Sequence, residues 1–489
     1  MKKFLNEVVI GLVLLGLTSL PAYASTLEKE LQKLRDAGIP TTLEELNLPE
    51  IPDGENGALV YKEVFKLMHS LREKYKREWD CIYGYDRIQG IAIHWDEIPR
   101  EEKKKVTNFI LHNTEFAKFY QLLEKASQMK CKFFKSDDYR KIFQKDPVEM
   151  SHITRTLSNL RACARTLTKK VRIEAENGEI DKALYTSLTG LKIAKSLSNE
   201  PYIVVQLTRN AMNMLASSIS EKITDEGKGN IELYQSLIKE MEEERKDNPI
   251  NFGLKGEIII TRLYFSAHYR KAGKEVFEFT EEDRKRIEGM FFREEDRKKM
   301  EKGTREWKGA LKEAYLKSGC KNPETFFDEQ ELFYLQTMSK IIPLTKEPYW
   351  EVREELKKIV DEIKKSPKEK AILTQWHGII GAHIYINEAR SDALLGAAEI
   401  GIANRIYKQK YGKYVNSLTQ LTPDILPSLP LDPFTGKDYI YKKKDKGFIV
   451  YSVGDNSKDD KGVSAQKKKW KGDYDIVWED KGEDFSFKK

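Results

Sequence analysis

The sequence predicts a mainly α protein, in which an irregular multi-helix bundle is followed by a small α+β domain with a short antiparallel sheet. Apolar residues recur at three- and four-residue spacing through most of residues 25–390, which is the period of helices with one buried face. Gly and Pro interrupt the chain after residue 411, and short β-rich runs follow. We therefore expect a helical domain over 25–390 and a second domain over 391–489.

The first 24 residues have the pattern of a secretory signal peptide. Lys2 and Lys3 precede an apolar core over residues 8–20, and Ala-Tyr-Ala at residues 22–24 forms a small-residue cleavage site. This core is shorter than the roughly 20 residues of a membrane-spanning helix. We expect a periplasmic or secreted protein, attached to a membrane only if the signal is not cleaved.

Composition limits the class of partner. Charged residues make up 33% of the chain and hydrophobic residues 40%, with a net charge of +7. This balance is typical of a helix-rich protein with solvated faces. Basic and acidic residues are mixed along nearly the whole chain, so the charge does not predict a nucleic-acid groove. We expect a protein or cell-envelope partner and no nucleic acid.

The cysteines leave two alternatives open. In an oxidising compartment they can form one or two disulfides, or they can be free, small core residues. Their wide spacing lacks the C-x-x-C pairs of a zinc or redox site. They are Cys81, Cys131, Cys163 and Cys320.

Three consecutive helices are predicted in the middle of the chain, and short connections make them antiparallel. Asn177-Gly178 ends the first helix, and Pro201 begins the third. The expected buried stripes are Leu157, Leu160, Ala164, Leu167 and Val171 in the first helix, Ile180, Leu184, Leu188, Leu191 and Leu197 in the second, and Val204, Leu207, Ala211 and Met214 in the third.

Other helices are predicted at 61–74, 323–342, 350–365, 368–387 and 392–411. Residues 175–184, with a Gly turn among small residues, resemble a tetratricopeptide hairpin. The pattern occurs once, without the repeat of about 34 residues that an array requires. An irregular bundle, tetratricopeptide-like in part, is therefore the predicted architecture of the helical domain.

Three short strands are predicted in the C-terminal domain, at residues 439–441, 448–451 and 475–478. Asp445-Lys446-Gly447 suits the turn between the first two strands. We expect these strands to form an antiparallel sheet that packs on the helix over residues 392–411.

An Asp-rich loop precedes the last strand. Ca²⁺ takes six to eight oxygen ligands, and carboxylates are abundant here. The spacing does not fit an EF-hand, because Asp460 stands where Gly is needed and Gln466 where Glu is needed. The alternative is a solvated loop whose acids offset nearby lysines. The predicted calcium ligands are Asp455, Asn456, Asp459, Asp473 and Asp475.

Residues 392–480 resemble the major pseudopilin of type II secretion systems. The order that carries the resemblance is a helix, Leu-Asp-Pro-Phe at 431–434, Tyr-Ser-Val-Gly at 451–454 and the Asp-rich loop. The resemblance implies a calcium ion in that loop, although Asn456 stands where the family places an Asp. The prepilin cleavage site and the long N-terminal apolar helix of the family are absent, so a polymerising subunit is not expected. Pro-Asp-Gly-Glu-Asn-Gly-Ala at 52–58, residues 159–197 and the same C-terminal motifs together resemble an exported bacterial family of uncharacterised function, over most of the chain.

No motif specifies a reaction. The seven histidines form no H-E-x-x-H pattern, and no nucleophile elbow, Walker loop or dinucleotide-binding turn is present. We therefore expect an exported interaction or structural module with a calcium-stabilised C-terminal domain. The alternative is a cell-envelope hydrolase with its active site in the helical domain. The sequence names no catalytic residue for it.

Overall fold

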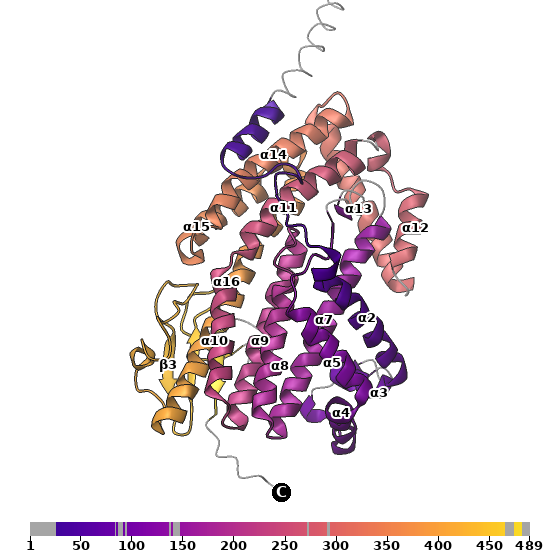
Figure 1. The fold of residues 1–489 in the computed structure, drawn as a ribbon. Helices are drawn as coiled ribbons and strands as arrows, with labels where there is room; N and C mark the ends of the chain where they lie inside the picture. Colours follow the sequence, from indigo (N-terminus) through magenta and orange to yellow (C-terminus); the bar gives the residue numbers. More distant parts are fainter. Residues whose placement is uncertain are drawn as a thin grey trace, which may run out of the picture.

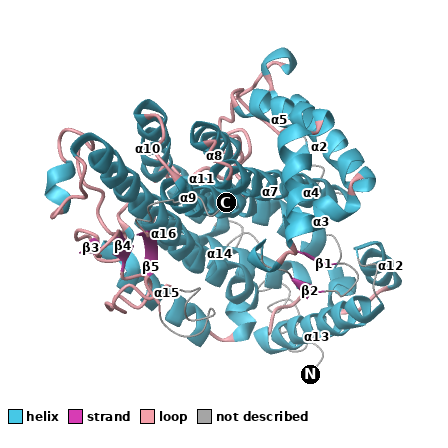
Figure 2. Ribbon diagram, turned by 90° about the horizontal axis from the view of Figure 1, so that it is seen from below, coloured by secondary structure: helices cyan, strands magenta, loops and turns pink. Residues whose placement is uncertain are grey.

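The computed structural model describes residues 26–83, 85–86, 91–92, 95–135, 138–139, 147–270, 273–290, 294–464 and 474–481. Over these residues the chain is mainly helical (Figure 1). It also contains a two-stranded hairpin and a three-stranded antiparallel sheet (Figure 2). This confirms the predicted mainly α class. The predicted signal peptide at 1–24 lies outside the described residues.

The N-terminal helices form one side of the bundle. Asn113 fixes the start of α5, because its side chain accepts a hydrogen bond from the Phe116 backbone N–H at 3.0 Å and caps the helix. The elements are a helix over 26–36, η1 (Asp53–Glu55), α2 (Gly57–Lys74), α3 (Lys76–Tyr83), β1 (Tyr85–Asp86), β2 (Ile91–Ala92), η2 (Trp95–Glu97), α4 (Arg100–His112) and α5 (Thr114–Ser127).

The three central helices are α7 (Pro147–Glu176), α8 (Ile180–Lys195) and α9 (Ile203–Glu226), and they pack side by side. Gly178 makes the turn between α7 and α8 with a φ of +77°, a left-handed value that favours glycine. The stripes predicted for the first two helices are buried, with Leu188 partly so. The prediction of α7 and α8 is confirmed.

The stripe predicted for the third helix is wrong. Val204 is 40% exposed, while Leu207, Ala211 and Met214 are half-buried. Helix α9 lies among α8, α11 and α16, so its burial is set by neighbours on several sides (Figure 2). Its most deeply buried residues include a polar row at helical spacing, the polar stripe of α9. This stripe consists of Gln206, Arg209, Asn210, Asn213, Ser217, Ser220 and Thr224.

The chain then continues through a second group of helices. The predicted helices at 368–387 and 392–411 form one continuous helix, α16, which ends at Gly412 with a φ of +75°. The elements are α10 (Ile231–Lys246), α11 (Pro249–Tyr264), η3 (Phe265–Arg270), η4 (Gly273–Phe277), α12 (Glu281–Met290), α13 (Glu294–Ser318), α14 (Pro323–Leu344), α15 (Tyr349–Lys365), α16 (Lys368–Tyr411) and η5 (Leu418–Leu421).

The C-terminal sheet has the strand order β3 (Ile440–Lys443), β4 (Phe448–Ser452), β5 (Ile476–Asp480), with both pairs antiparallel. It packs on α16, as predicted (Figure 2). The contact is close at Gly401, where a Cβ would lie 2.3 Å from the ring of Trp478. A larger residue at 401 would therefore displace the sheet.

The sheet shares its hydrophobic core with the helical bundle. Leu395 and Ile402 of α16 and Trp478 of β5 belong to the same buried cluster as Leu184 of α8 and Leu237 of α10. The boundary near residue 390 stays a prediction. In the structure α16 runs through it, and the two predicted domains are packed against each other.

Candidate functional site

The predicted calcium ligands are distributed along the loop between β4 and β5. Asp455 pairs with Arg390 of α16, whose Nε donates to Asp455 Oδ1 at 3.0 Å and whose Nη2 contacts the other carboxylate oxygen. Asn456 uses Oδ1 to accept the Lys458 backbone N–H at 2.9 Å, and its Nδ2 donates to Asp460 at 3.0 Å. Both residues are therefore engaged within the protein.

Two further predicted ligands also have protein donors. Asp459 Oδ1 accepts the Tyr451 hydroxyl at 2.8 Å, and this bond lowers the pKa of the Asp459 carboxyl. Asp475 is 1% exposed, and its carboxylate accepts the backbone N–H groups of Asp460 at 3.2 Å and Gly462 at 2.7 Å. The loop is thus closed by hydrogen bonds from its own main chain.

The fifth predicted ligand, Asp473, lies outside the described residues. Within the described part of the chain, no three side chains of His, Cys, Asp or Glu are grouped so that they could hold a metal ion. Each of the four placed ligands has at least one oxygen that accepts a hydrogen bond from a protein donor. Calcium binding stays a prediction from the sequence.

The cysteine alternatives are decided in favour of free thiols. Cys81, Cys131 and Cys163 are buried and Cys320 is half-buried, and none forms a disulfide. Burial raises the pKa of the Cys131 thiol to about 12. These cysteines act as small core residues rather than reactive groups.

A polar cavity of about 290 Å³ lies between α2, α3 and α7. We call it the basic cavity. It combines four basic side chains with hydroxyl, amide and aromatic groups from three helices. Its lining residues are Met68, His69 and Arg72 of α2, Trp79 and Tyr83 of α3, and Ser158, Asn159, Arg161, Ala162 and Arg165 of α7.

Helical spacing explains why these side chains meet. Ser158, Arg161 and Arg165 are separated by three and four residues, which puts them on one face of α7. The opposite face carries the buried stripe that includes Leu157 and Leu160. Burial of the apolar stripe in the core therefore holds the arginine face outward, toward α2 and α3.

The three arginines of this cavity stand without an ion-pair partner among the residues that the structure describes. Arg72, Arg161 and Arg165 form no ion pair or hydrogen bond with any residue that the structure describes. Residues 150–173 contain six Lys or Arg and no Asp or Glu, so no acid lies within helical reach of Arg161 or Arg165. This segment departs from the mixed charge of the rest of the chain, and it is the sequence signal that could have found the site.

Trp79 also borders the basic cavity. It is 1% exposed and packs edge-to-face on Phe109 and Phe119. It also packs on Tyr83, with ring centroids 6.2 Å apart, and the indole opposes the rise in the pKa of the Tyr83 hydroxyl that burial causes.

A second cavity, of about 310 Å³, lies between α5, α7 and α8. We call it the paired cavity, because its charged groups are engaged with one another. Lys170 Nζ contacts Glu174 Oε1, and Thr186 Oγ1 donates to Glu174 Oε2 at 2.7 Å. Lys170 Nζ also lies 4.3 Å from the centroid of the Tyr120 ring. Burial raises the pKa of Glu174, and Lys170 opposes that rise.

The rim of the paired cavity is satisfied as well. The Tyr185 hydroxyl donates to Glu124 at 2.6 Å, Asp181 accepts the Asn230 backbone N–H at 2.7 Å, and Lys182 pairs with Glu179 at 2.9 Å. These contacts join α5, α8 and the segment before α10. The polar groups of this cavity therefore serve the packing of helices.

The polar stripe of α9 also has a structural role. Arg209 is 2% exposed and forms a bidentate pair with Glu244 of α10, at 3.0 and 2.9 Å, while Asn213 donates to the same carboxylate at 2.7 Å. Ser220 accepts the Trp478 indole N–H at 3.0 Å and so ties the sheet to the bundle. The helical spacing of these polar residues is the sequence signal for this network.

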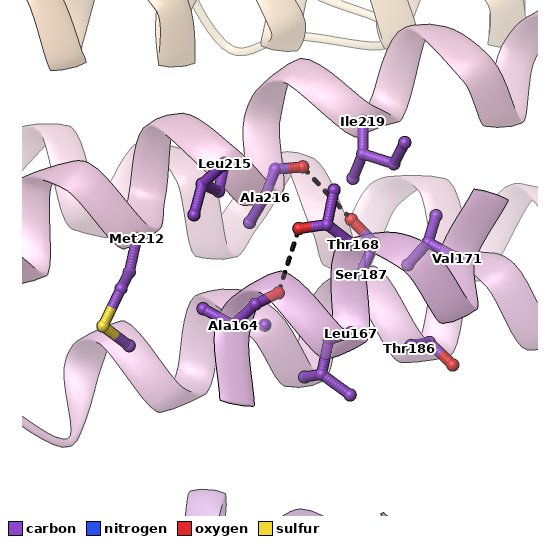
Figure 3. Close-up of a pocket in the computed structure, with 11 residues that line it drawn as sticks. Ala164, Leu167, Thr168, Val171, Thr186, Ser187, Met212, Leu215, Ala216 and Ile219 are labelled. Carbon is purple, nitrogen blue, oxygen red and sulfur yellow. Dashed lines mark hydrogen bonds between the residues drawn. The ribbon is translucent and has the colours of Figure 1, made fainter. Parts of the chain in front are cut away.

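A third void, between α7, α8 and α9, is too small for a ligand. Figure 3 shows Leu167, Val171 and Ile219 around it, with Thr168 bonded to the Ala164 carbonyl at 3.0 Å and Ser187 bonded to that of Ala216 at 3.4 Å. Its volume of about 10 Å³ is near the minimum for one water molecule. The centre of the bundle is therefore packed.

No protein-family model, no curated protein and no solved structure matches this chain. Over the part of the chain that the structure describes, no helix combines the length and apolarity needed to cross a bilayer.

Proposed function

We propose that the protein is an exported interaction module that binds an anionic group of its partner in the basic cavity. The observation that supports this proposal is that Arg72, Arg161 and Arg165 line one cavity and form no ion pair or hydrogen bond with the described residues. Three converging guanidinium groups repel one another, and an anion placed between them would replace repulsion with attraction. The net charge of +7 favours the approach of such a ligand.

The donor set suits an oxyanion. Guanidinium groups bind phosphate and carboxylate oxygens through paired, charge-assisted hydrogen bonds. Ser158 and Asn159 add neutral donors on the same helix, and His69 adds an imidazole N–H. The volume of about 290 Å³ is at the small end of ligand pockets. Phosphate is the expected group, because it brings the largest charge for its size.

Calorimetric titration of the full chain with orthophosphate tests this proposal. We expect saturable binding that Arg161→Gln/Arg165→Gln weakens by about tenfold or more, since charged hydrogen bonds contribute roughly 1.5–3 kcal/mol each. The matched control is Lys285→Gln/Lys299→Gln, which removes two exposed charges from α12 and α13, away from the cavity. Absence of binding, or equal weakening in both double variants, would contradict the proposal.

The alternative function is a cell-envelope hydrolase in the helical domain. The observation that favours it is that two carboxyl groups, of Glu174 and Asp181, line the paired cavity, as an acid and a base would. Glu174 is already bonded to Lys170 and Thr186, so it has no free position for a substrate proton. We therefore rank the interaction module first.

For residues 391–489 we retain two finer predictions as proposals, namely likeness to the major pseudopilin and calcium binding. The tetratricopeptide likeness of residues 175–184 is retained in the same way. The arrangement of α16, three antiparallel strands and the loop closed by Asp475 supports the likeness to the major pseudopilin. Calcium binding is tested by titration of calcium into the chelator-treated full chain, with Asp455→Ala and Asp475→Ala variants. Binding that both variants abolish would support calcium, and absence of heat would refute it.

A further inference from the structure

The basic cavity stands at the end of a longer row of unpaired cations on α2. Lys62, Lys66, His69 and Arg72 follow one another at intervals of four, three and three residues, so they share one face of the helix. All four are exposed. Like the arginines of the cavity, Lys62 and Lys66 have no ion pair within the described part of the chain. We call this row the α2 cation row.

The length of the row exceeds the cavity. With a rise of 1.5 Å per residue, Lys62 and Arg72 are about 15 Å apart along the helix axis. Only His69 and Arg72 of this row line the cavity. A small anion held between Arg72, Arg161 and Arg165 would leave Lys62 and Lys66 unused.

Nearby acids do not neutralise the row. Glu73 lies 3.8 Å from Lys76, beyond the end of the row. Glu63 is exposed and forms no ion pair with described residues. On α7, which forms the other wall of the cavity, residues 150–173 carry no acid. The third wall, α3, carries Glu78 and Asp80, so the basic surface around the cavity is formed by α2 and α7.

We propose that the ligand is an extended phosphate-bearing chain. One phosphate would lie in the basic cavity, and phosphates further along the chain would contact Lys66 and Lys62. This inference rests on the proposed function and names the class of its ligand. Binding of a linear polyanion gains from each phosphate that is neutralised, because condensed counterions are released. A row of unpaired cations that leads into a cavity is the arrangement that such a chain requires.

The aromatic residues favour a simple phosphate chain over a nucleic acid. Sequence-tolerant binding of single strands depends on aromatic rings on which bases stack. The aromatic residues that line the cavity offer little such surface, because Trp79 is 1% exposed and Tyr83 is half-buried. The exposed residues of the α2 cation row are aliphatic cations, an imidazole and a guanidinium.

Chain-length dependence tests the inference. The full chain is titrated with orthophosphate, tripolyphosphate and a polyphosphate long enough to span the row, at several salt concentrations. We expect the affinity per molecule to rise at least about tenfold from orthophosphate to the long chain, with a steeper salt dependence. Lys62→Gln/Lys66→Gln should remove most of that gain and leave orthophosphate binding unchanged, whereas Lys285→Gln/Lys299→Gln should do neither.

The outcomes separate this inference from the proposed function. Equal affinity for orthophosphate and the long chain, or an unaltered gain in Lys62→Gln/Lys66→Gln, would overturn the extended ligand and leave the anion site standing. Failure of orthophosphate to bind would overturn the proposed function itself. Single-stranded RNA of matched charge that binds more tightly than polyphosphate would overturn the class of ligand.

Discussion

The basic cavity and the paired cavity are nearly equal in volume, at about 290 and 310 Å³, and both are bordered by α7. They differ in what their charges contact. Lys170 has Glu174 four residues along the same helix, and Arg172 has Glu176 at the same interval. Arg161 and Arg165 have no acid at any such position. Lys170 and Glu174 both contact Thr186 of α8, so this pair links two helices, whereas Arg161 and Arg165 are available to a ligand.

This comparison predicts opposite consequences for removing a cation. At the buried Lys170 of the paired cavity the loss should appear as instability of the fold. In the basic cavity it should appear as lost binding with little change in stability. Three predictions follow from the largest expected effect to the smallest.

The largest effect is expected for Lys170→Met. The Glu174 carboxylate is 1% exposed, and removal of its cation would leave it buried without compensation. Breaking a buried ion pair in this way costs about 3–5 kcal/mol. Denaturant unfolding at pH 7 should show that loss of free energy of unfolding. Lys182→Met, which breaks an exposed pair with Glu179, should cost less than about 1 kcal/mol. Equal effects would contradict the structural role of Lys170.

An intermediate effect is expected at Asp392, where burial raises the pKa to about 8 from an ordinary value of 3.8, although Arg245 opposes the rise. The folded state therefore binds the proton more tightly than the unfolded state. The contribution of this proton to the free energy of unfolding is fully present below about pH 4, and it is lost as the pH rises toward 8.

Asp392→Asn keeps the side chain neutral at every pH. The variant and the parent should have similar stability near pH 4, and the variant should be more stable by about 1–3 kcal/mol at pH 8. Melting temperatures across this pH range provide the measurement. A variant whose stability falls with pH as steeply as that of the parent would show that another group controls the titration. Glu388, whose pKa is also raised by burial and by Asp392, would then be the next group to test.

The smallest change in stability is expected for Arg161→Gln/Arg165→Gln. These side chains are exposed and pair with nothing in the described protein, so the free energy of unfolding should stay within about 0.5 kcal/mol of the parent. Orthophosphate should raise the melting temperature of the parent but not of this variant, because a ligand of the folded state stabilises it by mass action. A large loss of stability without ligand would show that the arginines support the fold.

Much of the fold could be predicted because helical and strand periods are local properties of the chain. The stripes of α7 and α8, the helices α14 and α15, and the three C-terminal strands are found where the sequence places them. The prediction was wrong for α9, where Gln206 and Arg209 are buried and Val204 is exposed. A polar side chain can be buried when another helix provides its hydrogen-bond partner, as Glu244 of α10 does for Arg209. The spacing of residues within one helix does not reveal a partner on another helix.

The site was harder to predict than the fold. The sequence predicts a calcium site in the Asp-rich loop because its acids lie close together in the chain. In the structure the described acids accept hydrogen bonds from Arg390, Tyr451 and main-chain N–H groups. The net charge of the whole chain does not indicate the arginines of the basic cavity, because it averages over the acid-free segment at residues 150–173. The charge of this helix alone indicates a basic surface.

The sequence by itself determined which segments are helical, which faces of α7 and α8 are apolar, and that Arg161 and Arg165 have no acid within reach on their own helix. Only the tertiary structure decided that these arginines meet Arg72 and Trp79, which lie more than 80 residues earlier in the chain. The physical reason is that a helix fixes the neighbours of a side chain within four residues. The partner across a cavity depends on which helices the burial of apolar faces brings together.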